Sequence, residues 1–281
     1  MKLVKGLLIF FLFLTIILAF DSKNREEKRV GSVPLINSSM DSLTISCDYT
    51  RQDLLQGLTA YDVEDGYITD SIIPGPFESF TEKGVSEIEY FVYDSADNCG
   101  RYKRKIIFSD YISPKLTLSG PLVFYVKEAS DGDVIYCLHA TDCLDGDLKQ
   151  IRVDKSNINY AAAGDYKITV SLVNSFGDTA SYNLPVHIIR KSYRGLDIRL
   201  KENLIYLKSG SDFDPAAYVK EVEQSMTEEL LPQKDWGINI QSNVDTSKPG
   251  VYEVQYMIEK KEDKVYGSVS GITWLTVIVT D

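Results

Sequence analysis

Acidic side chains gather with glycine and asparagine in short segments, a composition typical of loops that hold carboxylates close together. Several carboxylate oxygens that converge in loops suit a hard cation such as Ca²⁺, which takes about six to eight oxygen ligands. The same side chains also stabilise turns without a metal, because an Asp carboxylate accepts hydrogen bonds from nearby backbone N–H groups. The sequence leaves both interpretations open. The candidate calcium ligands are Asp62, Glu64, Asp65, Asp94, Asp97, Asp110, Asp142, Asp145, Asp147 and Asp178.

No other residue pattern points to catalysis. The sequence contains no HExxH, GxSxG, GxGxxG, Walker or CxxC motif. Its two histidines, His139 and His187, fall on expected strands without a ligand-spaced partner, which predicts satisfied strand residues rather than metal ligands. Trp274 lies in an alternating segment and is expected in the core. We therefore expect a protein that is not an enzyme and that uses no cofactor other than Ca²⁺.

The composition narrows the class of protein further. The chain has 281 residues, a formal net charge of −11, 44% hydrophobic residues and 25% charged residues. These fractions are close to those of an average globular protein, which argues against wholesale disorder. The acidic balance argues against a nucleic-acid-binding protein, because such a protein needs a basic face to neutralise phosphates.

The segments that carry the carboxylates occur in two copies. Residues 58–66 match residues 138–146, and the segment from Gly84 matches the segment from Gly164, both at an offset of 80 residues. One register kept at two separated motifs indicates two copies of one structural unit. A third, looser copy begins near residue 248 and lacks the Asp-Gly motif.

Apolar residues alternate within each copy, which predicts half-buried strands. A helix is expected from Pro215, with Asp214 as its N-cap. Short strands separated by turns, in units of this size, predict small β-sandwiches and an all-β fold. Strands are expected over 88–92, 122–126, 166–172, 184–189, 196–200, 204–207, 251–256 and 272–279.

The order of these motifs resembles that of bacterial surface Ig-like domains, which are similar in pattern to hyalin-repeat and cadherin-like modules. The resemblance rests on TAYDVEDGYIT and GVSEIEYFVYDSADN in the first copy, HATDCLDGDL and GDYKITVSLVNSFGD in the second, and GITWLTVIV in the third. It implies three tandem Ig-like β-sandwich domains, at 34–110, 111–190 and 191–281. It also implies extracellular, non-enzymatic modules that serve as spacers or in adhesion. In cadherin-like arrays calcium stiffens the joint between domains, and the resemblance implies that role for the loop carboxylates and Asp110.

The N-terminus indicates the compartment. Lys2 and Lys5 precede an apolar run over 6–20, the pattern of a cleaved signal peptide or of an uncleaved signal anchor helix over residues 1–20. The charged segment 21–33 is expected to be a polar stalk. Either alternative places the rest of the chain outside the cytoplasm, secreted to the cell surface or anchored in the membrane.

Four cysteines in an extracytoplasmic protein suggest disulfides. Cys137 and Cys143 flank an expected strand, so they are too far apart to pair. Cys47 is expected to end the first strand and Cys143 to lie in the entry loops of the second domain. A Cys47–Cys143 bond between domains is one prediction, and four unpaired thiols are the alternative.

The sequence is consistent with three functions. The first is a surface protein whose modules act as a spacer or as an adhesion module for a protein or glycan at the cell envelope. The second is a purely structural envelope protein without a ligand, and the third is an accessory module of a secreted polysaccharide-processing system. A partner should bind an exposed aromatic or apolar patch, which a spacer does not require.

Overall fold

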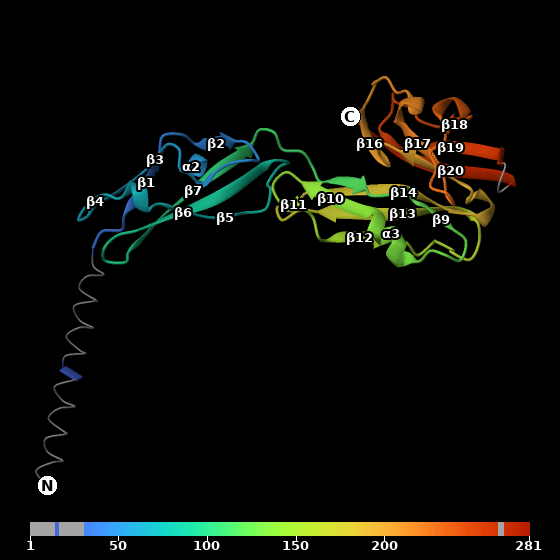
Figure 1. Cartoon of the computed structure of the whole chain (residues 1–281). Helices are drawn as coiled ribbons and strands as arrows, with labels where there is room; N and C mark the ends of the chain where they lie inside the picture. The colour runs from blue at the N-terminus through green and yellow to red at the C-terminus, as the bar shows by residue number, and fades with distance from the viewer. Residues whose placement is uncertain (1–14, 17–30, 264–266) are drawn as a thin grey trace, which may run out of the picture. The chain divides into compact units, whose positions relative to one another are not determined.

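The computed structural model describes residues 15–16, 31–263 and 267–281 (Figure 1). Apart from residues 15–16, the predicted signal or anchor segment lies outside the described residues, as does most of the predicted stalk. Within the part of the chain that is described, no helix is both long and apolar enough to cross a membrane.

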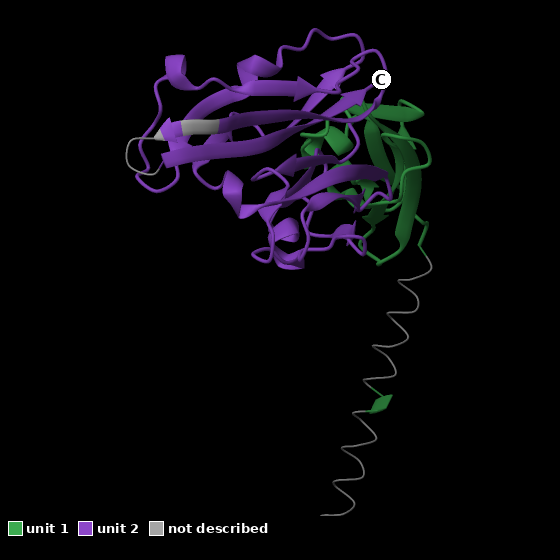
Figure 2. Cartoon of the chain, turned by 90° about the vertical axis from the view of Figure 1, so that its right-hand side faces the viewer, with its two compact units in different colours: residues 1–111 green, residues 112–281 purple. Residues whose placement is uncertain are grey.

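The chain forms two compact units, residues 1–111 and residues 112–281 (Figure 2). Strands dominate both units, so the predicted all-β class is confirmed. Every predicted strand segment overlaps a strand of the structure. The finer division into three domains, with boundaries after 110 and 190, stays a prediction.

Unit 1 places two sheets face to face. Its sheets have the orders β1-β3-β4 and β2-β7-β6-β5, and β2 runs parallel to β7. Ile36 and Ala60 are buried from the first sheet and Ile88 from the second, because alternate side chains of each strand point to one face. The elements of unit 1 are β1 Leu35–Ser38, β2 Ser42–Ile45, α2 Arg51–Leu54, β3 Leu58–Asp62, β4 Gly66–Tyr67, η1 Thr69–Ser71, β5 Ile73–Phe77, β6 Val85–Tyr93 and β7 Cys99–Phe108.

The first half of unit 2 repeats this plan. Its sheets have the orders β11-β10-β8 and β12-β13-β14-β9, and β9 runs parallel to β14 as β2 does to β7. Its elements are β8 Lys115–Leu118, β9 Val123–Tyr125, α3 Asp131–Cys137, β10 Leu138–Asp142, β11 Gly146–Asp147, β12 Ile151–Asp154, β13 Gly164–Val173, β14 Thr179–Ile189 and η2 Lys191–Tyr193.

The second half of unit 2 uses a two-stranded sheet, β15-β17, and a four-stranded sheet, β16-β20-β19-β18. Again a short strand, β16, runs parallel to the last strand, β20. The elements are β15 Leu196–Leu200, β16 Leu204–Lys208, η3 Pro215–Tyr218, β17 Val219–Gln224, η4 Gln233–Asp235, β18 Asn239–Ser242, β19 Gly250–Asp263 and β20 Gly267–Thr280.

The helix predicted from Pro215 is wrong beyond its first turn. Asp214 does cap this turn, accepting a hydrogen bond from the Ala216 N–H at 3.0 Å. The chain then enters β17, which pairs with β15 and buries Val222 completely. Pairing with a neighbouring strand and burial of an alternating face therefore override the local helix signal.

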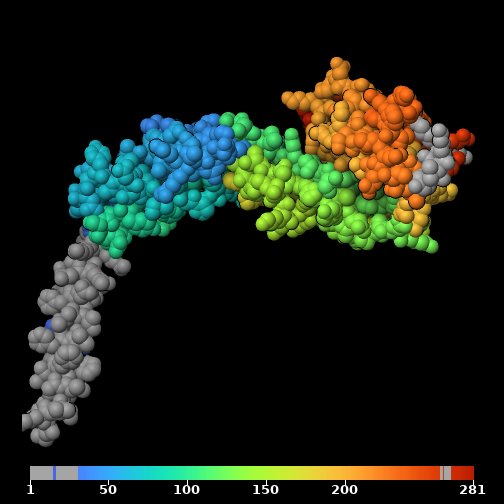
Figure 3. All heavy atoms as spheres, in the orientation of Figure 1, coloured from blue at the N-terminus to red at the C-terminus, as the bar shows by residue number. Residues whose placement is uncertain are grey.

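The two halves of unit 2 share a packed interface, which Figure 3 shows as contact between green-to-yellow and orange atoms. Leu204 and Ile278 of the second half are buried in the hydrophobic core of the first half. The Tyr206 hydroxyl accepts a hydrogen bond from the Leu116 N–H at 2.9 Å and donates to the Leu116 carbonyl at 3.1 Å. Shared core and paired hydrogen bonds make 112–281 one block rather than two flexibly linked sandwiches.

Candidate functional site

The Asp-Gly loop of unit 1 is organised by Asp62, whose side chain is buried. Its Oδ1 accepts hydrogen bonds from the N–H groups of Glu64 and Asp65 at 2.9 and 3.0 Å, and its Oδ2 accepts one from the Ser32 hydroxyl. Burial would raise the pKa of Asp62, but these hydrogen bonds outweigh burial and hold the pKa below its ordinary value. The Ser32 hydroxyl also lies 2.6 Å from the Glu64 carboxylate.

Asp65 ties this loop to the turn between β6 and β7. Its carboxylate accepts hydrogen bonds from the Ser95 N–H at 2.6 Å and from the Ser95 hydroxyl at 2.9 Å. In the second copy Asp145 binds the N–H and hydroxyl of Ser175 in the same way, at 2.6 and 2.7 Å. The Asp-Gly loop and the turn before the last strand of the sandwich therefore meet at one end in both copies.

Most of the other candidate calcium ligands accept hydrogen bonds from nearby loop residues, and two of them are exposed. Asp142 accepts hydrogen bonds from the N–H groups of Leu144 and Asp145, as Asp62 does in the first copy. Asp94 accepts hydrogen bonds from the N–H groups of Ala96 and Asn98. Asp110 accepts hydrogen bonds from the Cys47 N–H and the Ser46 hydroxyl. Asp178 accepts a hydrogen bond from the Ser113 hydroxyl. Asp97 and Asp147 are exposed.

These contacts favour the turn interpretation of the carboxylates. Within the described residues, no group of three or more His, Cys, Asp or Glu side chains is arranged to hold a metal ion. Calcium binding stays a prediction, which the following experiment tests.

Replacing Asp145 with Asn is expected to lower the thermal midpoint of unit 2 by about 2–4 °C, because one acceptor for Ser175 is lost. Asp212→Asn, at an exposed position of unit 2 that is not among the candidate ligands, is the matched control and should leave the midpoint unchanged. Thermal unfolding is measured in millimolar calcium and in chelator, and the wild-type midpoints are expected to coincide. A calcium-dependent rise that Asp145→Asn abolishes would instead establish the predicted metal site.

The predicted Cys47–Cys143 bond joins the two units. Cys47 belongs to unit 1 and Cys143 to unit 2, and the pairing therefore stays a prediction. Cys137 and Cys143 flank strand β10 as expected from the sequence.

An exposed apolar patch lies on the outer face of the β1-β3-β4 sheet of unit 1. Leu35, Tyr61 and Tyr67, here named the aromatic patch, are 61%, 45% and 82% exposed, and Val63, in the turn after β3, is 70% exposed. Leu35 pairs with Tyr61 across the strands, and Tyr61 pairs with Tyr67. The two tyrosine rings meet edge to face with their centroids 5.3 Å apart. Solvent-exposed aromatic clusters of this kind mark interaction surfaces.

The second copy shows that the fold does not need this patch. Lys115 pairs with Thr141, and Thr141 pairs with Asp147, in the register that joins the patch residues of unit 1. Polar residues thus stand where unit 1 has leucine and two tyrosines. Because the same sheet forms with polar side chains in the second copy, apolar side chains at these positions are not required to form it.

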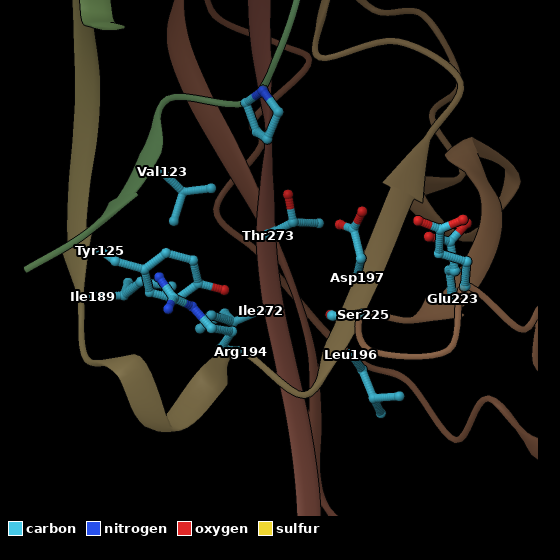
Figure 4. A pocket seen from close by; sticks show the side chains of 12 residues that line it. Val123, Tyr125, Ile189, Arg194, Leu196, Asp197, Glu223, Ser225, Ile272 and Thr273 are labelled. Carbon is cyan, nitrogen blue, oxygen red and sulfur yellow. The ribbon is translucent and has the colours of Figure 1, made fainter. Parts of the chain in front are cut away.

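A second feature is a cavity of about 410 Å³ between the halves of unit 2, here named the joint cavity (Figure 4). Arg194 stacks over the Tyr125 ring at 4.6 Å and forms an ion pair with Glu128. On the other side lie Asp197 and Glu223 (Figure 4). The cavity is lined by Pro121, Val123, Tyr125, Ile189, Arg194, Leu196, Asp197, Glu223, Ser225, Glu228, Ile272 and Thr273.

A buried histidine cluster also joins the halves of unit 2. The His187 Nδ1 lies 2.8 Å from Asp165 Oδ1, and its Nε2 lies 2.5 Å from Glu253 Oε1. The imidazole stacks on Trp274 with the ring centroids 3.9 Å apart. Burial would lower the pKa of His187, but the hydrogen bonds and charges of Glu253 and Asp165 outweigh burial and raise it above its ordinary value. The predictions of a satisfied strand histidine at His187 and of a buried Trp274 are confirmed, whereas His139 is exposed on β10.

Comparison with known proteins gives relatives but no family. No family model matches the chain. An uncharacterized 81.3 kDa protein of Acholeplasma phage L2 is 26% identical over 246 residues, which are 85% of this chain and 32% of that protein. The pesticidal crystal protein Cry22Aa of Bacillus thuringiensis is 30% identical over 123 residues, 43% of this chain and 16% of that protein. The chain thus spans about a third or less of the length of these relatives.

Solved structures give weak likenesses. The CBM51-2 and INT domains of Clostridium perfringens ZmpB, in complex with GlcNAc, are 20% identical with a TM-score of 0.23, covering 53% of this chain and 26% of that chain. The protocadherin gammaB7 EC3-6 cis-dimer structure is 9% identical with a TM-score of 0.22, covering 87% and 73%. At these TM-scores the chains do not superpose as whole molecules.

Sequence reasoning placed the paired loops but missed the aromatic patch and the joint cavity. The patch had a detectable signal, because reading the two copies in register shows apolar residues at 35, 61 and 67 and polar ones at 115, 141 and 147. The joint cavity had none, since its walls come from four separate segments of unit 2.

Proposed function

We propose that this chain is a non-enzymatic, extracytoplasmic surface protein whose tandem β-sandwich modules bind a protein or glycan partner at the cell envelope through the aromatic patch of unit 1. The supporting observation is the contrast between the copies, which build one sheet with an apolar face in unit 1 and a polar face in unit 2. A purely structural envelope protein does not require three neighbouring exposed apolar side chains on one sheet face.

The patch offers the features that recognition surfaces use. Tyrosine supplies a large apolar ring and a polar hydroxyl while losing little conformational freedom on binding. Tyr67 is 82% exposed, so a partner would bury most of its surface. A partner of the apolar or sugar-ring class suits this surface better than a highly charged one. Calcium stiffening of the modules remains a separate part of the proposal and depends on the calcium experiment above.

Exchanging the patch for the residues of the second copy is expected to abolish binding without unfolding unit 1. The variant carries Leu35→Lys, Tyr61→Thr and Tyr67→Asp, each a residue that the same sheet already accepts in unit 2. Binding of the full chain is measured on cell-envelope material fractionated into protein and polysaccharide. A loss of tenfold or more in affinity, about 1.4 kcal/mol, is expected for one fraction.

Tyr136→Ser is the matched control. Tyr136 is 80% exposed in α3 of unit 2 and lies outside the patch. Its removal should leave binding unchanged. Equal binding by wild type and the patch variant, with both thermal midpoints intact, would reject the patch as the binding surface. The fraction that retains the wild-type chain identifies the partner as protein or glycan.

A further inference from the structure

The joint cavity has opposite charges on its two sides. Figure 4 shows Arg194 beside Tyr125 on one side and the carboxylates of Asp197 and Glu223 on the other. Apolar side chains lie between these ends, among them Ile272. A volume of about 410 Å³ falls within the range of small-molecule sites.

The charged groups are held in place by residues outside the cavity. Arg199 binds the Asp197 carboxylate at 3.3 Å and the Glu223 carboxylate at 2.9 Å, so both acidic groups are fixed. Glu128 holds Arg194 through an ion pair, yet a guanidinium has five N–H donors and keeps several for another acceptor. A ligand would therefore meet charges that are already positioned.

One nearly buried polar group of the cavity has no partner among the described residues. Thr273 is only 4% exposed, and its hydroxyl points into the cavity (Figure 4) without a hydrogen bond to any described group. The Glu228 carboxylate is exposed to solvent at the rim and forms no ion pair within the described residues. The Thr273 hydroxyl therefore offers a ligand in the cavity both a donor and an acceptor.

We propose that the joint cavity binds an ω-amino acid, in which an aliphatic chain separates an ammonium group from a carboxylate. The ammonium group donates to the acidic side formed by Asp197, Glu223 and Glu228, and to the Thr273 hydroxyl. The carboxylate accepts from Arg194, and the aliphatic chain lies along the apolar wall. This site lies in unit 2 and uses no residue of the aromatic patch, so a negative test of one proposal does not reject the other.

The proposal is tested with small bipolar and monopolar probes on the full chain. Isothermal titration calorimetry compares 6-aminohexanoate with hexylamine, which lacks the carboxylate, and with hexanoate, which lacks the ammonium group. The bipolar probe is expected to bind about tenfold more tightly than either single-charge probe, because it satisfies both sides of the cavity. 4-Aminobutanoate and 8-aminooctanoate then measure which charge spacing the cavity prefers.

Single substitutions locate the binding. Asp197→Asn and Thr273→Val are each expected to weaken 6-aminohexanoate about three- to tenfold, and Arg194→Gln is expected to remove the advantage over hexylamine. Glu202→Gln, at an exposed acid outside the cavity, and Thr276→Val, at a buried threonine of the same strand, are the matched controls. Failure of 6-aminohexanoate to bind, or equal binding by Asp197→Asn and Glu202→Gln, would overturn the proposal.

Discussion

Replacing Arg104 with alanine is expected to destabilise unit 1 by about 3–5 kcal/mol, enough to unfold a large fraction of it. Arg104 is only 2% exposed, in the middle of β7. Its guanidinium donates to the Gln56 and Leu54 carbonyls and lies 2.9 Å from the Tyr90 hydroxyl. Alanine removes the side-chain donor of the Gln56 carbonyl, leaves the Leu54 carbonyl with only the Tyr90 hydroxyl as a side-chain donor, and opens a void the size of the lost side chain.

Arg101→Ala is the matched control for this substitution. Arg101 lies on the same strand, is exposed, and makes a 3.9 Å contact with Glu89 and a contact over the Phe91 ring at 5.4 Å. Its loss should change the unfolding free energy by less than about 0.5 kcal/mol. Denaturant unfolding of the full chain, followed by hydrogen exchange in β6 and β7, measures both variants. Equal losses for the two would show that Arg104 does not organise the core of unit 1.

The second large effect is expected from pH, at the His187 cluster. A neutral imidazole has one N–H, so it can donate to only one of the carboxylates that face its two nitrogens, Asp165 and Glu253. The imidazolium ion can donate to both. The raised pKa means that the folded state holds this proton more tightly than the unfolded chain does.

The direction in which stability changes with pH follows from the higher pKa of His187 in the folded state. Below about pH 6.5, the ordinary value of histidine, the contribution of His187 to stability is fully present. It is lost as the pH rises through the raised pKa of the folded state. We therefore expect the joint within unit 2 to loosen as the pH rises through the raised pKa of His187, and not as the pH falls below the ordinary value of histidine.

Glu253→Gln is the comparison variant, because it keeps the shape of the partner and removes its charge. The difference in thermal midpoint between wild type and Glu253→Gln is measured from pH 5.5 to 9, and it should shrink as the pH rises. Titration of the His187 ring by NMR, with the signals assigned through His139→Gln, gives the pKa directly. A His187 pKa at or below its ordinary value would contradict this account.

The repeat made the loop geometry predictable. Asp62 and Asp142 hold equivalent turns, and Gly66 and Gly146 both adopt the left-handed backbone, with φ of 75° and 68°. Such turns depend on residues that are close together in sequence, so the sequence motif is enough to predict their conformation. The strands were predictable for a similar reason, because the alternation of apolar and polar residues shows which face of a strand is buried.

Burial of polar residues was not predictable in this way. Arg104 occupies a buried strand position where the second copy has Leu184, and no local pattern distinguishes a buried arginine from an exposed one. Its two carbonyl partners come from the end of α2 and the residues just after it, about 50 residues earlier, and only the folded sandwich brings them together. The His187 cluster is similar, because Asp165 and Glu253 reach the ring from different strands.

The short helices could have been found from their ends. Thr50 and Asp53 form a capping box in unit 1, and Ser130 and Asp133 form the equivalent box in unit 2. Each pair satisfies backbone N–H groups at the start of a helix of only one or two turns. Hydrophobic periodicity does not reveal such short helices, because they offer too few apolar positions.

The most direct measurement of the central claim is a transfer of the aromatic patch from unit 1 to the second copy. The chain without the patch, with Leu35→Lys, Tyr61→Thr and Tyr67→Asp, receives Lys115→Leu, Thr141→Tyr and Asp147→Tyr. Its binding to the envelope fraction that retains the wild-type chain is then measured. If the exposed side chains of the patch perform the recognition, binding returns to within about tenfold of the wild-type affinity. A folded chain that carries the transferred patch and still fails to bind would contradict the claim that these exposed side chains perform the recognition.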